Sequence, residues 1–330
     1  MSRKLLSYTA LGLILGNAAI ADVPKVAVDI APVHSLVSRV MEGVGSPKLI
    51  IPAGASPHEY SLRPSEAKSL QDADMVIWMG EDLAPWMENS IEKLAKNAEV
   101  ITLLEASETK LLDYREGALF EEHDHGDHDD HDDHDDHDHD KDHDDHDDHD
   151  DHDDHAGHDH GEHDPHAWLS IENAQTWLNL VAGKLSAADP ENAGVYFGNA
   201  AAARSEIEEL SKEVNSILDP VRGRSFVVFH DAYQYFETSF DFPASGAISL
   251  GDATDPSASR IAEIQGRVRE EGINCVLSEP QYNPNLVETV LEGTDAKTGV
   301  IDPLGVNLEP GSKLYGDLIR NMAKSLAGCL

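Results

Sequence analysis

Apolar runs of strand length recur through the first half of the chain, and amphipathic segments separate them. The runs are rich in Val, Ile and Leu and lie at residues 23–30, 48–51, 75–79 and 100–104. The segments between them have the apolar repeat of helices and lie at residues 35–41, from Pro64 onward and at 86–96. This alternation predicts a mostly parallel sheet covered by helices.

The same alternation restarts after residue 220. Strand-like apolar runs lie at residues 225–229, 244–249, 274–277 and 299–301. Segments with a helical repeat lie at residues 257–271, 284–291 and 312–326. The second half of the chain is therefore predicted to form another α/β unit.

One long amphipathic segment joins the two units. Residues 191–218 are rich in Ala and Glu, with Pro190 before them and Pro220 after them. We predict an α/β fold of two lobes, each with a parallel-type sheet flanked by helices, joined by this single long, rigid helix. The expected boundaries are residues 22–188 for the N-terminal lobe, 189–219 for the linking helix and 220–330 for the C-terminal lobe.

Serines mark the expected starts of several helices, because a serine hydroxyl can accept a hydrogen bond from a free N–H in the first turn. Ser35 follows the break at residues 31–34 and is expected to cap a helix that runs to Met41. Ser65, Ser170 and Ser257 are expected to cap later helices.

The first 21 residues have the features of a cleavable secretory signal peptide. Arg3 and Lys4 precede a mostly apolar stretch, which ends in Ala19-Ile20-Ala21, so Asp22 is the expected mature N-terminus. No later stretch approaches the roughly 20 apolar residues that a membrane-spanning helix needs. We therefore expect a protein of the Gram-negative periplasm that is not embedded in the membrane.

The negative charge of the chain is concentrated in one segment. The formal net charge is −39, of which residues 121–164 contribute −23 through 24 Asp or Glu and one Lys. The remaining charge of −16 is still acidic and argues against nucleic-acid binding.

Residues 121–163 form an insert of His-Asp-Asp repeats that contains 15 of the 19 histidines. With almost no apolar residue, the insert is expected to be a disordered loop. Interleaved imidazoles and carboxylates favour an auxiliary, weaker zinc-collecting or zinc-sensing segment over a merely solvated charge run. Its histidines are His123, His125, His128, His131, His134, His137, His139, His143, His146, His149, His152, His155, His158, His160 and His163.

Four histidines lie outside the insert. Three of them lie in loops or at the ends of predicted strands, where a ligand could bind. His58 follows a strand and a Pro/Gly loop, His166 lies in Asp-Pro-His-Ala-Trp, and His230 directly follows a buried strand. The carboxyl ends of parallel strands form the usual ligand crevice, and Zn²⁺ prefers such nitrogen ligands. The spacing of the three histidines in the sequence does not decide whether each one is a zinc ligand or an ordinary buried or surface histidine.

Four segments carry a resemblance to a known family. They are Pro-His-Glu-Tyr-Ser-Leu-Arg-Pro-Ser (57–65), Asp-Pro-His-Ala-Trp-Leu (164–169), Phe-His-Asp-Ala-Tyr-Gln-Tyr-Phe (229–236) and Ile-Asp-Pro-Leu-Gly (301–305). They resemble, in order and over the whole mature chain, the metal-binding receptors of bacterial ABC transporters. The acidic His-rich insert just before the second histidine is similar to that of the zinc branch, the ZnuA-type receptors.

The resemblance implies a function as well as a site. It makes His58, His166 and His230 the Zn²⁺ ligands, the first two from the N-terminal lobe and the third from the C-terminal lobe, with the metal in the cleft. Manganese receptors resemble the third segment but carry Glu where this chain has His230. The resemblance thus implies a protein that captures Zn²⁺ with high affinity in the periplasm and delivers it to the membrane permease of an ABC importer. We expect this protein to act as a monomer.

The fourth zinc ligand is left open by the resemblance. Asp302 matches a carboxylate ligand of the manganese branch, whereas some zinc receptors place a Glu directly before the first histidine. In this chain that residue is Pro57, and Glu59 follows the histidine instead. Water or Asp302 is favoured over Glu59, and His34 is expected to be a structural residue rather than a ligand.

The two cysteines, Cys275 and Cys329, lie near the C-terminus. In an oxidising compartment a pair of cysteines favours one disulfide over two reduced, buried thiols. The resemblance also implies this Cys275–Cys329 disulfide.

Two other functions compete with that of a transport receptor. A secreted zinc hydrolase would also use three histidines and a water, but the chain contains no HExxH or GxSxG motif, so we expect no enzymatic activity. A zinc buffer or surface adhesin would need no permease, and the signal peptide lacks the cysteine that a lipid anchor would use.

Overall fold

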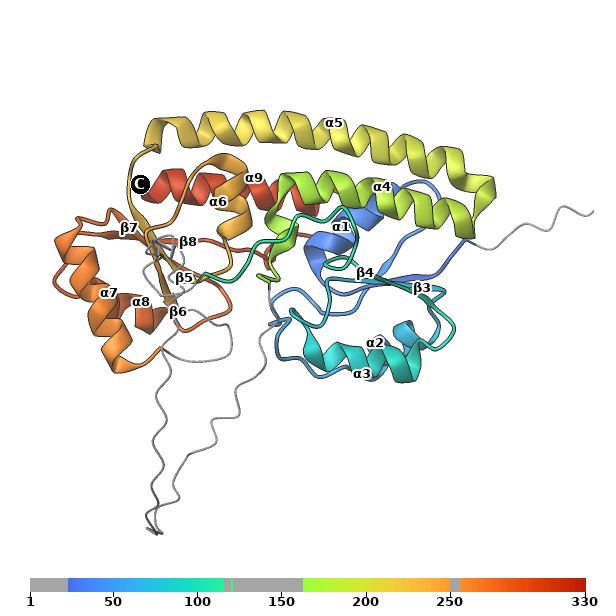
Figure 1. Ribbon diagram of the computed structural model, residues 1–330, viewed down its shortest axis with the longest axis horizontal. Coiled ribbons are helices and arrows are strands. Elements are labelled where there is room, and N and C mark those ends of the chain that lie inside the picture. The colour runs from blue at the N-terminus through green and yellow to red at the C-terminus, as the bar shows by residue number, and fades with distance from the viewer. Residues whose placement is uncertain (1–22, 116–119, 121–162, 250–255) are drawn as a thin grey trace, which may run out of the picture.

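The computed structural model describes residues 23–115, 120, 163–249 and 256–330 (Figure 1). The expected signal peptide lies outside the described residues, as does the expected insert except for its last residue, His163.

The first sheet consists of four parallel strands in the order β2-β1-β3-β4. All residues of the two inner strands, β1 (Val26–Val28) and β3 (Met75–Trp78), are buried. A parallel strand covered on both faces requires a continuous apolar run, which these segments supply. The edge strands are β2 (Lys48–Leu49) and β4 (Glu99–Thr102). The helices of this unit are α1 (Ala31–Val40), α2 (Pro64–Gln71) and α3 (Pro85–Leu94).

The second sheet repeats the same arrangement with four parallel strands in the order β6-β5-β7-β8. Its strands are β5 (Phe226–His230), β6 (Ala247–Ser249), β7 (Cys275–Ser278) and β8 (Lys297–Val300). The helices around it are α6 (Gln234–Phe240), α7 (Ala258–Glu270) and α8 (Pro284–Leu291). Two parallel sheets flanked by helices are the fold that the apolar pattern predicts.

A single long helix, α5 (Ala193–Leu218), connects the two halves (Figure 1). Its 26 residues span about 39 Å at 1.5 Å per residue. Short 3₁₀ turns at Pro190–Asn192 and Asp219–Val221 bound it, so the two prolines lie just outside the helix as expected. Within the described residues, none of the helices is both long and apolar enough to cross a bilayer.

Two further helices pack along α5 and tie the halves together. α4 (Ile171–Ala188) lies beside α5, and α9 (Leu314–Cys329) returns from the second sheet to pack against α5 and α1. The Tyr315 N–H donates to the Ser35 hydroxyl oxygen over 2.9 Å, which joins the start of α9 to α1. The lobe boundaries 22–188, 189–219 and 220–330 stay a prediction.

Two of the four expected serine caps are wrong. α1 begins at Ala31, with Pro32 in its first turn, because a proline there costs no hydrogen bond. Ser35 therefore lies inside the helix. α2 begins at Pro64, and the Glu66 carboxylate accepts the Arg63 N–H over 2.7 Å in place of a cap by Ser65.

The other two serine caps are confirmed. The Ser170 hydroxyl accepts the Asn173 N–H, and the Ser257 hydroxyl accepts the Arg260 N–H, each over 3.2 Å. The short helix α6 is absent from the sequence prediction, because seven residues rich in aromatic side chains are too few to display a helical repeat.

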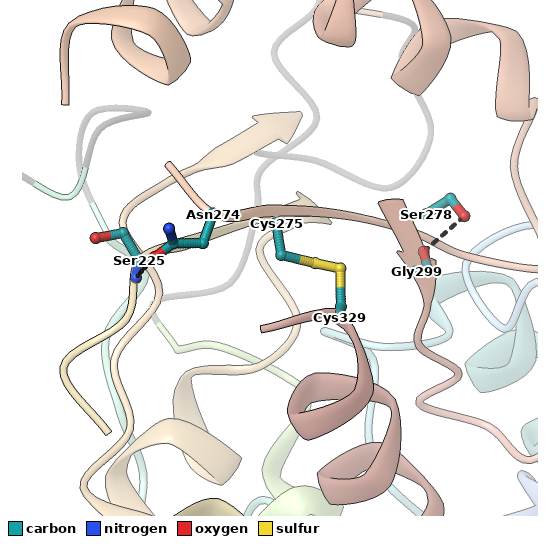
Figure 2. The surroundings of a disulfide bond; sticks show 6 residues. All are labelled: Ser225, Asn274, Cys275, Ser278, Gly299 and Cys329. Carbon is teal, nitrogen blue, oxygen red and sulfur yellow. Dashed lines mark hydrogen bonds between the residues drawn. A yellow bond between two sulfur atoms is a disulfide. The ribbon is translucent and has the colours of Figure 1, made fainter. Parts of the chain in front are cut away.

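The predicted disulfide between Cys275 and Cys329 is confirmed (Figure 2). It joins the first residue of β7 to the last residue of α9, with the two Cα atoms 5.8 Å apart. Gly299 of β8 lies against it, where an added Cβ would be 3.2 Å from the Cβ of Cys329. A side chain at this position would push the disulfide away from the sheet.

Replacing both cysteines by Ala is expected to lower the free energy of unfolding by about 4 kcal/mol, because the cross-link closes a loop of 54 residues in the unfolded chain. Urea unfolding of the oxidised protein and the variant measures the difference. Reductant should lower the stability of the wild type to that of the variant and leave the variant unchanged. An equal unfolding midpoint for all samples would contradict this prediction.

Candidate metal centre between the lobes

The three histidines singled out in the sequence lie together. His58 is in the loop after β2, His166 precedes a 3₁₀ turn (Ala167–Leu169), and His230 is the last residue of β5. The ring centroids of His58 and His166 are 5.8 Å apart, and those of His166 and His230 are 5.3 Å apart. The first two come from the half of the chain before α5 and the third from the half after it.

The spacing of these rings is close to that of a tetrahedral zinc site. Two imidazoles that bind one Zn²⁺ at 2.0–2.1 Å have ring centroids about 5 Å apart. Across the described ranges, no three His, Cys, Asp or Glu side chains yet lie at the distances of a closed metal site. The rings therefore have to approach one another slightly to share an ion.

A buried carboxylate orients His166. The Asp164 Oδ1 atom lies 2.7 Å from the His166 Nδ1 atom and also accepts the His166 backbone N–H over 2.9 Å. Both side chains are at most 5% exposed. Because a carboxylate only accepts hydrogen bonds, Nδ1 carries the proton and Nε2 keeps the lone pair that binds a metal.

His230 has the same kind of partner, from a different strand. The Glu279 Oε1 atom lies 2.6 Å from the His230 Nδ1 atom, and Glu279 directly follows β7. Glu279 is absent from the candidate residues predicted from the sequence. Its position after a buried parallel strand was the available signal, since such strand ends surround the ligand crevice.

The histidines line a cavity of about 20 Å³ together with Glu279, Trp168 and other side chains. This volume holds about one water molecule or one ion and leaves no room for an organic substrate. The Trp168 Nε1–H donates to the Pro303 carbonyl oxygen over 2.9 Å, which closes one wall with residues from both halves of the chain.

Neither carboxylate considered as a fourth ligand lines this cavity. Asp302 Oδ1 accepts the N–H groups of Leu304 and Gly305 over 3.0 and 2.9 Å, and Oδ2 accepts that of Val306 over 2.6 Å. The Asp302 carboxylate therefore holds its own loop in shape. Glu59 is exposed to solvent.

His34 is buried in α1 and does not line the cavity. Its Nε2 atom lies 3.3 Å from the Pro47 carbonyl oxygen. Burial lowers the pKa of His34, which favours the neutral ring in this position. These contacts agree with the structural role expected from the sequence.

Of the insert histidines, His163 is described, and the other fourteen, from His123 to His160, lie outside the described residues. His163 forms an antiparallel bridge with Asp113, and its Nδ1 atom lies 2.9 Å from the Asp113 Oδ1 atom. The last residue of the insert therefore pairs with the chain segment that ends at Arg115, and it directly precedes Asp164.

A buried ion-pair cluster connects the two halves beside the histidines. The Arg115 guanidinium donates to the carboxylates of Asp231 and Glu237, and all three side chains are at most 16% exposed. Nearby, the Tyr235 hydroxyl donates to the Asp164 carbonyl oxygen over 3.0 Å. These contacts fix the C-terminal half against the segment that carries His166.

Comparison with known proteins shows the family of this chain. A family model described as "Zinc-uptake complex component A periplasmic" matches residues 26–329. The high-affinity zinc uptake system protein ZnuA of Paracoccus denitrificans is 48% identical over 328 residues, covering 98% of each chain. The protein of the same name from Brucella abortus is 46% identical over 315 residues, covering 96% of this chain and 94% of that one.

A solved structure of a zinc-bound ZnuA deletion mutant has the same fold. Its TM-score is 0.70 at 19% sequence identity, with 93% of this chain and 98% of that chain covered. The family model extends over nearly the whole described chain, and both relatives match almost end to end. The chain therefore belongs to the ZnuA family of periplasmic zinc-uptake components.

Proposed function

We propose that this protein captures Zn²⁺ in the periplasm and delivers it to the membrane permease of an ABC-type zinc importer. The relatives from Paracoccus and Brucella are named as high-affinity zinc uptake proteins, and the solved ZnuA deletion mutant holds zinc. The expected cleavable signal peptide would carry the chain to that compartment, where it acts as a monomer.

The observation that carries the proposal is the carboxylate behind each of two converging histidines. His166 and His230 are each tied at Nδ1, and His58 lies beside His166. We propose that the Nε2 atoms of His166 and His230 and a ring nitrogen of His58 bind one Zn²⁺. Such carboxylate–histidine–metal arrangements fix the ligand ring and raise its basicity.

The charges around the cavity suit a divalent ion. Asp164 and Glu279 are buried and place two negative charges behind neutral imidazoles. Zn²⁺ would offset both charges, and three nitrogen ligands favour it over the oxygen-preferring Mn²⁺. We propose water as the fourth ligand, because both Asp302 oxygens already accept backbone N–H groups.

The ligand set also suggests how the ion is released. His58 and His166 come from the N-terminal half, and His230 is the single ligand from the other half. A permease that shifts the C-terminal half slightly would remove one of three nitrogen ligands and weaken binding. The cavity has room for about one ion, which fits transport of Zn²⁺ as cargo rather than catalysis on a larger molecule.

We propose that the insert of residues 121–163 is an auxiliary zinc-collecting segment. Its imidazoles lack a preorganised geometry, so each site should bind zinc more weakly than the cavity does. Its last residue, His163, is held by the bridge to Asp113 and directly precedes Asp164, so zinc held by the insert would be concentrated near the cavity.

Deleting residues 121–162 is expected to remove the weaker sites and leave one tight site with unchanged affinity. The deletion spares His163 and its bridge to Asp113, so it should not disturb Asp164. Titration calorimetry with Zn²⁺ measures both classes of site. A control in which a Gly/Ser linker replaces the same residues should behave identically. If the deletion abolished tight binding, the cavity would not be the functional site.

A further inference from the structure

Glu279 lies at the end of a rigidly held strand. β7 pairs in parallel with β5, and in this register Phe226 is paired with Cys275 and Val227 with Val276. The disulfide fixes the first residue of β7 to α9 (Figure 2). Glu279 follows Ser278, the last residue of β7. The position of its carboxylate is therefore set by the sheet and not by a loose loop.

One oxygen of this carboxylate is fully used by His230. Oε1 lies 2.6 Å from the His230 Nδ1 atom and 3.4 Å from the His230 backbone N. The Glu279 side chain has no exposed surface. A single carboxylate oxygen thus fixes both the ring and the backbone of the proposed ligand.

The other oxygen is costly for the folded protein. Glu279 Oε2 and the nearby Tyr233 hydroxyl are both buried, and neither makes a hydrogen bond of ordinary length and angle among the described residues. Burial raises the pKa of Tyr233 most, and the charge of Glu279 and a weak hydrogen bond with it raise that pKa further. A buried carboxylate with one poorly paired oxygen destabilises a fold, so its presence beside His230 calls for a functional reason.

We propose that Glu279 is a positioning residue for zinc capture. It holds the His230 ring so that Nε2 faces the ion, and its charge offsets part of the charge of the divalent cation. Asp164 does the same for His166 from two residues away, whereas Glu279 acts on His230 from a neighbouring strand. The only ligand from the C-terminal half therefore depends on β7. This inference rests on the proposed function, because His230 must bind the ion.

The test replaces Glu279 by Gln, which keeps the shape and can still accept the Nδ1–H but loses the charge. We expect Glu279→Gln to weaken zinc binding 10- to 100-fold, measured by competition with a chelator on the full mature chain. The absorption spectrum with one equivalent of Co²⁺ should shift, because the ring of His230 is less firmly held. The metal-free variant should resist urea at least as well as the wild type, since a partly unpaired buried charge is gone.

Asp189→Asn is the matched control. Asp189 is an equally buried carboxylate outside the cavity, and its Oδ2 accepts hydrogen bonds from Asn192 and Tyr196 and not from a histidine. Its loss should lower the stability of the metal-free protein and leave the zinc affinity and the Co²⁺ spectrum unchanged. The two variants thus separate a positioning role from a structural one.

Two results would overturn the inference. One is a zinc affinity of Glu279→Gln within twofold of the wild type, and the other is a weaker affinity matched by an equal loss of metal-free stability. A His230→Ala variant in the same series distinguishes the two proposals. If His230→Ala binds zinc normally, the proposed function fails, whereas normal binding by Glu279→Gln alone removes only the role of Glu279.

Discussion

Replacing His230 by Ala is expected to weaken zinc binding at the tight site by more than 100-fold. Loss of a residue that only supports a ligand costs about 10- to 100-fold in metal affinity, so loss of a ligand should cost more. His230 is also the only proposed ligand from the C-terminal half, so the ion would no longer join the two halves. Competition with a chelator of known affinity measures the change.

His163→Ala is the matched control for this prediction. His163 is the histidine at the base of the insert, and its described partner is Asp113 rather than a residue of the cavity. Its loss should leave the tight site unchanged. Cells that produce His230→Ala should also fail to grow when zinc is scarce, whereas His163→Ala should support growth. Full affinity and full growth with His230→Ala would contradict the assignment.

Replacing Arg115 by Ala is expected to lower the free energy of unfolding by about 3–5 kcal/mol. The substitution leaves the carboxylates of Asp231 and Glu237 buried without their cation, which is the costly way to break a buried ion pair. Urea unfolding at neutral pH measures the loss. Lys184→Ala, which removes an exposed ion pair with Glu99, should change the stability by less than about 1 kcal/mol.

The effect of Arg115→Ala should depend on pH. Burial raises the pKa of Glu237, and Arg115 offsets part of this rise. Without Arg115 the folded-state pKa rises further above the unfolded value, so stability is lost as the pH rises between the two values. The deficit of the variant should therefore be smaller near pH 4 than at pH 7. A deficit that grows on acidification would contradict the role of Arg115.

The architecture was predictable because each structural element left a local pattern. Continuous apolar runs such as 75–79 predicted buried parallel strands, and Pro190 and Pro220 marked the ends of the linking helix. The start of α1 was less evident, because Ala31-Pro32 is compatible with both a break and a first helical turn. The Ser35 hydroxyl accepts a hydrogen bond from the backbone N–H of Tyr315, which lies 280 residues away in the sequence, so no local pattern could predict this contact.

The site was predictable only in part, for the same physical reason. The histidines stand out by residue type and by their place after strands, and membership of a zinc-uptake family confirms a binding protein rather than an enzyme. The partners Glu279 for His230 and Asp231 for Arg115 are 49 and 116 residues away in the sequence. No local pattern pairs such residues. The carboxylate of Asp302 suggests a ligand, but its oxygens bind nearby backbone N–H groups.

In the proposed site, one zinc ion is bound by three histidines from both halves of the chain. Anomalous X-ray diffraction at the zinc edge, from crystals of the zinc-loaded protein, locates that ion. We expect a strong peak in the cavity, about 2.0–2.1 Å from the Nε2 atoms of His166 and His230 and from a ring nitrogen of His58. A cavity without zinc, or an ion held by residues of one half alone, would rule out this site.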